Sequence, residues 1–96
     1  MVSIDEELKG AKAAKAAMDQ LSTSATPTKI ALVRTLRAAN TAAVLNVGSG
    51  GALNEVRTNV GIALSNVINR SPTLETIEKA KAAIDAWIKE LEAAKG

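Results

Sequence analysis

The sequence predicts an all-α protein, an antiparallel up-down-up-down four-helix bundle. Apolar residues recur at three- and four-residue spacing in four segments of similar length, and no segment alternates apolar and polar residues over the length of a strand. Capping residues, prolines and glycines separate the four segments. Because the connections are short, consecutive helices should lie antiparallel. We therefore expect residues 1–96 to form a single helical-bundle domain, with helices at about 4–21, 27–47, 52–69 and 72–94.

The first predicted helix follows a capping pattern. Ser3 and Glu6 are spaced as a capping box, in which each side chain bonds a backbone N–H that the helix leaves unpaired. The polar residues 22–24 end this helix. Its apolar stripe is Ile4, Leu8, Ala11, Ala14, Met18 and Leu21.

The second and third predicted helices are separated by the glycine-rich residues 48–51, which stop a helix readily. Thr26 and Pro27 supply an N-cap and a proline at the first helical position, where its missing N–H costs nothing. The second stripe is Leu32, Val33, Leu36, Ala39, Ala43 and Val47. The third stripe is Leu53, Val56, Val60, Ala63, Leu64 and Val67.

The fourth predicted helix begins with a second cap-and-proline pair, Ser71 and Pro72. Its opposite face is charged, and Trp87, the only aromatic residue of the chain, should face the core. Its apolar stripe is Ile77, Ala80, Ile84, Trp87, Ile88 and Leu91.

The composition disfavours most catalytic chemistry. The chain has no Cys and no His, which removes thiol nucleophiles, imidazole bases and the usual zinc ligands. Glu7 falls toward the buried arc of its helix and Lys15 and Lys81 lie at the edges of theirs, but a first-turn carboxylate suits the helix dipole and edge lysines extend into water. We expect no enzyme activity, no cofactor and no metal.

The sequence also lacks membrane and export signals. No segment has the charged, apolar and small-residue order of a signal peptide, and no apolar run approaches the roughly 20 residues that span a bilayer. We expect a soluble, cytoplasmic protein that does not bind a membrane.

A polar residue and a glycine interrupt the apolar pattern at one level of the predicted bundle. Asn40 lies within the apolar arc of the second helix, and folding back at the glycines brings it level with residues 59–61, which include Gly61. A polar group beside a missing side chain is typical of a ligand pocket. It is also typical of close packing, with Asn40 fixing the helix register, and we favour that interpretation.

The outer face of the third helix is the strongest candidate for a binding surface. Seven uncharged residues occupy about 140° of its circumference, and Glu55 is the only charged residue within that arc. Interface centres are poor in charge, so we expect contact with another protein chain or with a second copy of this one. The candidate interface consists of Asn54, Thr58, Asn59, Ile62, Ser65, Asn66 and Asn69.

Two alternatives stay open. The first is a small nucleic-acid-binding protein that contacts phosphates through Arg34, Arg37, Arg57 and Arg70, all in the middle of the chain. It is disfavoured because the net charge is only +2 and no aromatic platform exists for stacking bases. The second is an engineered or de novo scaffold without function beyond its fold, suggested by the alanine–lysine run at residues 11–17 and by the Gly-Ser-Gly-Gly turn.

Overall fold

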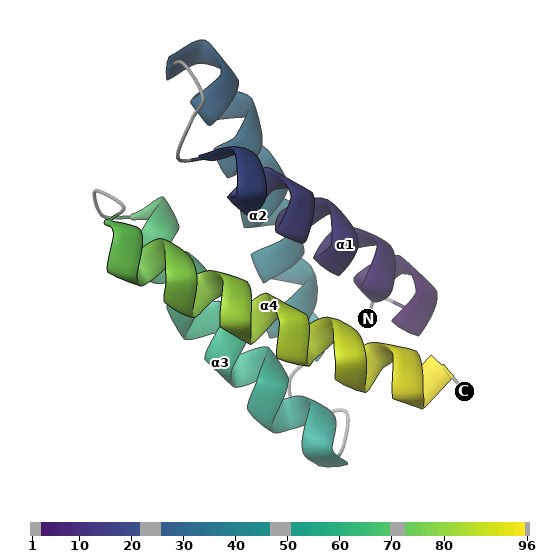
Figure 1. Ribbon diagram of the computed structural model, residues 1–96. Helices are drawn as coiled ribbons and strands as arrows, with labels where there is room; N and C mark the ends of the chain where they lie inside the picture. Colours follow the sequence, from purple (N-terminus) through teal and green to yellow (C-terminus); the bar gives the residue numbers. More distant parts are fainter. Residues whose placement is uncertain (1–2, 22–25, 47–50, 70–72, 96) are drawn as a thin grey trace.

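Four α-helices account for nearly all of the described chain (Figure 1). The computed structural model describes residues 3–21, 26–46, 51–69 and 73–95. The helices are α1 (Ile4–Leu21), α2 (Thr26–Asn46), α3 (Gly51–Ile68) and α4 (Leu74–Lys95). No strand occurs within these ranges. The prediction of an all-α four-helix fold is confirmed.

The helices form a ring of four in which each contacts two neighbours. α1 packs against α2 and α4, and α3 packs against the same two helices. Consecutive helices run in opposite directions, so α1 begins and α4 ends on the same side of the molecule (Figure 1). This arrangement places the seam between α2 and α3 opposite the seam between α1 and α4.

Side-chain caps set two of the helix starts. The Ser3 hydroxyl accepts a hydrogen bond from the Glu6 backbone N–H at 3.1 Å, as the capping pattern predicts. The fourth helix starts two residues later than predicted, because Thr73 is its cap: its hydroxyl accepts from the Thr76 N–H at 3.2 Å, and the Thr76 hydroxyl accepts from the Thr73 N–H at 2.8 Å. Ser71 and Pro72, the predicted start, lie outside the described residues.

One aliphatic core receives side chains from all four helices. It contains most of the predicted stripe residues, and Trp87 is fully buried as expected. The predicted stripe residues that pack at its edge rather than inside it are Ile4, Leu32, Leu53, Val56, Ala63 and Ile88. Val33 is half-buried and is not part of the core. The side chain of Leu21 and the whole of Val47 lie outside what the structure describes. The buried apolar residues are Leu8, Ala11, Ala14, Ala17, Met18, Leu36, Ala39, Ala43, Val60, Leu64, Val67, Ile77, Ala80, Ile84, Trp87 and Leu91.

Candidate functional site

A polar network lies inside this core and takes one residue from each helix. Glu7 of α1 is fully buried, and it is surrounded by Asn46 of α2, Arg57 of α3 and Trp87 of α4. Glu7 Oε1 accepts hydrogen bonds from Asn46 Nδ2 at 2.6 Å and from Arg57 Nη2 at 2.8 Å. Its second oxygen, Oε2, accepts from Arg57 Nε at 2.9 Å and from Trp87 Nε1 at 2.7 Å. A single carboxylate therefore joins all four helices.

The network satisfies its charges internally. Arg57 approaches Glu7 with two nitrogens, the bidentate geometry that gives the strongest carboxylate pairing. Its Nη1 donates to the backbone carbonyl of Asn46 at 3.0 Å, near the carboxyl end of α2 where helix carbonyls lack intrahelical partners. The guanidinium is thus held by α1 and α2 together, which fixes the position of α3 against both.

The hydrogen bonds decide the protonation state of Glu7. Burial alone raises the pKa of a carboxyl group, because it disfavours the charged form. At Glu7 the hydrogen bonds from Arg57, Asn46 and Trp87, together with the positive charge of Arg57, outweigh burial and bring the pKa below its ordinary value of 4.5. Glu7 is therefore an anion at neutral pH.

This network corrects two interpretations made from the sequence. Glu7 lies in the first turn of α1 as predicted, but its carboxylate is buried in the core and paired with Arg57 instead of being stabilised by the helix dipole alone. Arg57, one of the four arginines considered for phosphate binding, is 2% exposed and bonded to Glu7, so its guanidinium is turned away from any surface ligand. The sequence signal for this pair was the position of Glu7 on the buried arc, where a charge needs a partner.

The outer face of α3 gathers the seven residues predicted as an interface. Ile62 stands at its centre with 61% of its surface exposed. Thr58, Asn59 and Asn69 are exposed, whereas Asn54, Ser65 and Asn66 are half-buried at its edges. Within α3 the only charged residues are Glu55 and the inward-facing Arg57.

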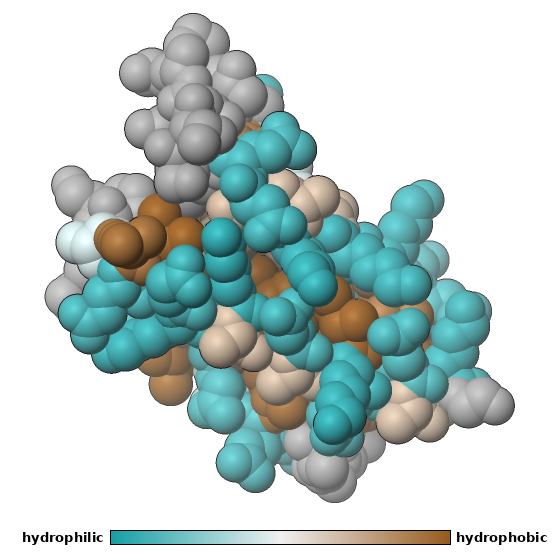
Figure 2. Space-filling view, in the orientation of Figure 1, coloured by the Kyte–Doolittle hydropathy of each residue, from teal (hydrophilic) through white to brown (hydrophobic). Residues whose placement is uncertain are grey.

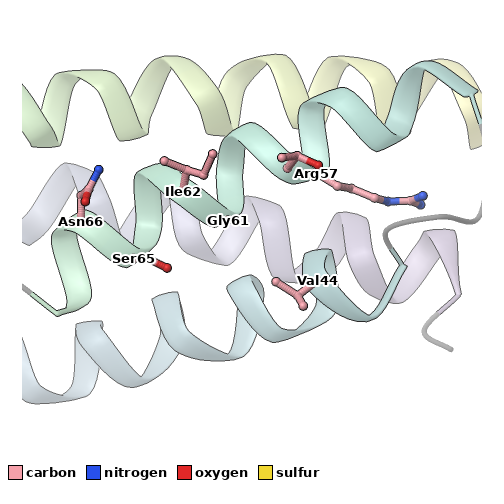
Figure 3. A pocket seen from close by; sticks show the side chains of 7 residues that line it. Val44, Arg57, Gly61, Ile62, Ser65 and Asn66 are labelled. Carbon is pink, nitrogen blue, oxygen red and sulfur yellow. The ribbon is translucent and has the colours of Figure 1, made fainter.

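A groove lies on the α2 side of this face. It has a volume of about 600 Å³, and Figure 3 shows Val44 reaching from α2 toward α3 beside Gly61. Ile62 and Ser65 line it from α3, so its wall combines branched apolar side chains with a hydroxyl group. The full lining is Val44, Arg57, Thr58, Gly61, Ile62, Ser65 and Asn66.

A second, smaller groove lies on the α4 side of the same face. Its volume is about 270 Å³, and Thr76 and Lys79 of α4 form its far wall. Ile62 and Asn66 line both grooves. Ile62 is therefore the top of a ridge with a groove on each side.

The predicted meeting of Asn40 and Gly61 is confirmed. A Cβ atom placed on Gly61 would lie 3.6 Å from Asn40 Oδ1 and 3.7 Å from Val44 Cγ2, which are ordinary contact distances. Helix approach does not require a glycine here, so the missing side chain deepens the groove instead. Asn40 Oδ1 is buried and is the one such side-chain atom in the described chain that has no hydrogen-bond partner.

The other candidate groups are dispersed. Arg34 and Arg37 are exposed on α2, and Arg70 lies outside the described residues. Lys15 is exposed and pairs with Asp85, and Lys81 pairs with Asp19. In the ranges that the structure covers, no three acidic side chains are placed to hold a metal ion, and no helix is both long and apolar enough to cross a bilayer.

Comparison with known proteins adds no relative: no protein-family model, no curated protein and no solved structure matches the chain.

Proposed function

We propose that this protein is a non-enzymatic assembly module that associates with a second copy of itself through the outer face of α3. The observation that carries the proposal is the position of Ile62, a largely exposed isoleucine on a ridge between two grooves. Ridges that fit into grooves are the general basis of helix packing. An exposed ridge with a groove on each side can therefore pack against another helix.

Most of the large exposed apolar side chains belong to α2 and α3. Four large apolar side chains are exposed among the described residues, and three of them, Val44, Leu45 and Ile62, belong to α2 and α3. Val44 and Ile62 line the same groove. α3 alone, roughly 27 Å long and 10 Å wide, offers too little area for a typical interface of about 800 Å² per partner. The proposed interface therefore includes the adjacent surface of α2.

The chemistry of the face favours an identical partner. A two-fold contact brings the same patch of both copies together, so the patch must complement itself. Amide and hydroxyl groups carry both a donor and an acceptor and can pair with their own kind, whereas like charges repel. Apart from Glu55, the outer face of α3 carries only amide, hydroxyl and aliphatic groups, because the charge of Arg57 is neutralised inside the core.

Sedimentation equilibrium of matched variants tests the proposal. We expect the wild type to associate with rising concentration and Ile62→Glu to stay monomeric, because a charge would be buried at the centre of the contact. Leu74→Glu is the control: Leu74 is 74% exposed but lines neither groove, so this variant should associate like the wild type. A wild type that is monomeric up to about 1 mM, where a contact worth roughly 4 kcal/mol would be visible, refutes the proposal.

A further inference from the structure

On α3, the residues four positions before and four positions after Ile62 are chemically similar. Thr58 lies four residues before Ile62 and Asn66 four residues after it, and both reach the groove beside α2. Seven residues away, however, the two directions differ. Glu55 is on one side and Asn69 on the other, and both are exposed. This difference distinguishes the ways in which two copies of α3 can pair.

A parallel pairing of two α3 helices places identical residues opposite each other. The two Glu55 carboxylates would then face each other across the contact, and like charges at that position are destabilising. No cation of α3 is available to offset them, because Arg57 is bonded to Glu7 in the core. The parallel arrangement therefore conflicts with the charges on the helix.

An antiparallel pairing centred on Ile62 removes this conflict. Each residue then faces one that lies equally far on the other side of Ile62, so Thr58 is opposite Asn66 and Glu55 is opposite Asn69 of the other copy. The two Glu55 residues are separated by about 21 Å at a rise of 1.5 Å per residue, well beyond the Debye length of about 8 Å at physiological ionic strength. The Asn69 amide can donate to the Glu55 carboxylate, and antiparallel helix dipoles also favour this pairing.

We infer that two copies of this chain join through a two-fold contact in which their α3 helices run antiparallel and the two Ile62 side chains meet beside the axis. The inference rests on the proposed function and adds the direction and register of the contact. Ile62 of each copy sits near Gly61 of the other, where the missing side chain deepens the groove. A ridge and a recess in adjacent positions on one helix are what a self-complementary contact requires.

Disulfide cross-linking tests the register cleanly because the chain has no cysteine of its own. We would prepare Thr58→Cys and Asn66→Cys, one of them labelled with ¹⁵N so that mixed and identical pairs differ in mass. At a protein concentration where sedimentation shows the dimer to predominate, we expect mild oxidation of the mixture to give roughly tenfold more mixed disulfide than either identical pair, because only facing thiols have a high effective concentration within the dimer. Sedimentation of each reduced variant first measures how much of the wild-type association it retains, because both substitutions lie in the proposed contact.

The outcomes separate the inference from the proposed function. Identical-pair disulfides of Thr58→Cys alone and of Asn66→Cys alone, without the mixed species, would establish a parallel contact and overturn the inference while the assembly function stands. If the wild type associates but the cysteine variants form none of the three disulfides, the inference is also overturned, because another surface would then form the contact. A monomeric wild type would remove the proposed function itself.

Discussion

The two opposite seams of the ring differ in the chemistry of their exposed surfaces. The seam between α1 and α4 is crossed by four ion pairs: Lys12 with Glu92, Lys15 with Asp85, Lys81 with Asp19 and Lys95 with Asp5. No ion pair of the described chain joins α2 to α3. There the surface is a groove with exposed apolar side chains and one buried amide oxygen that has no partner.

The sequence distributes charge in the same way. α1 and α4 carry seven and nine charged residues, whereas α2 and α3 carry three and two. Figure 2 shows hydrophilic side chains gathered over α1 and α4. At Lys15 the hydrogen bond to Asp85 and the charge of that carboxylate raise the pKa of the ammonium group, so the lysine is held in its charged form. The charged groups of the α1–α4 seam are already paired with each other. The α2–α3 seam instead exposes apolar side chains that a partner can cover.

The buried network connects these two halves, and breaking it should give the largest effect. Glu7→Gln leaves the Arg57 charge in the core without a counter-charge, and breaking one side of a buried pair costs about 3–5 kcal/mol. A domain of this size has roughly 5–15 kcal/mol of stability in total, so this variant should be close to unfolding. Urea denaturation measures the loss. Glu6→Gln, at the exposed neighbouring position, is the control and should change little.

The same variant should change the pH dependence of stability. A carboxyl whose pKa is lower in the folded state stabilises the fold above its unfolded value, about 4.5, and loses that contribution as pH falls through the folded value. The difference in unfolding free energy between wild type and Glu7→Gln should therefore shrink as pH falls below about 4.5. The other carboxylates are common to both chains and cancel. A difference that stays constant from pH 7 to about pH 3 would show that Glu7 does not titrate below its ordinary value.

The fold was readable from the sequence, but the network was not. Helical spacing and the Ser3 cap located α1, and the apolar stripes identified most of the core. The pattern also placed Asn40 opposite Gly61, because both lie on the sides of their helices that face each other. The apolar pattern of a helix carries no information about its neighbours, so a charged residue on the buried arc only interrupts the pattern and does not reveal its partner.

Glu7 and Arg57 are 50 residues apart, so their pairing depends on how three-dimensional packing aligns two helices. Asn46 was likewise missed: the predicted helix 27–47 includes it, but a single polar residue in the last turn of a helix gives no sign of a buried partner. The α3 face was identified correctly as poor in charge because charge content is a property of one helix alone. The grooves beside it depend on the neighbouring helices and required the structure.

An intermediate effect is expected at the uncharged seam. Asn40→Leu replaces an amide whose oxygen is buried without a partner by an apolar group of similar size, which removes a desolvation penalty of about 1–3 kcal/mol. We expect the monomer to become more stable by about 1 kcal/mol after repacking, as measured by thermal unfolding. Thr41→Leu introduces leucine at an exposed position of the same helix, away from both grooves, and controls for the helix propensity of leucine. A destabilised Asn40→Leu variant would mean that the amide is bonded in solution.

The smallest effect is expected at the charged seam. Asp85→Asn removes the partner of Lys15, but both side chains are more than half exposed, so water replaces the lost contact at almost no cost. The midpoint of thermal unfolding should stay within the error of the measurement at low and at high salt. The pKa of Lys15 should fall back toward 10.5, which NMR titration of its side chain can follow. If unfolding instead shifted as far as it does in Asn40→Leu, the ion pairs would be holding α1 against α4, and the two seams would differ in strength as well as in surface chemistry.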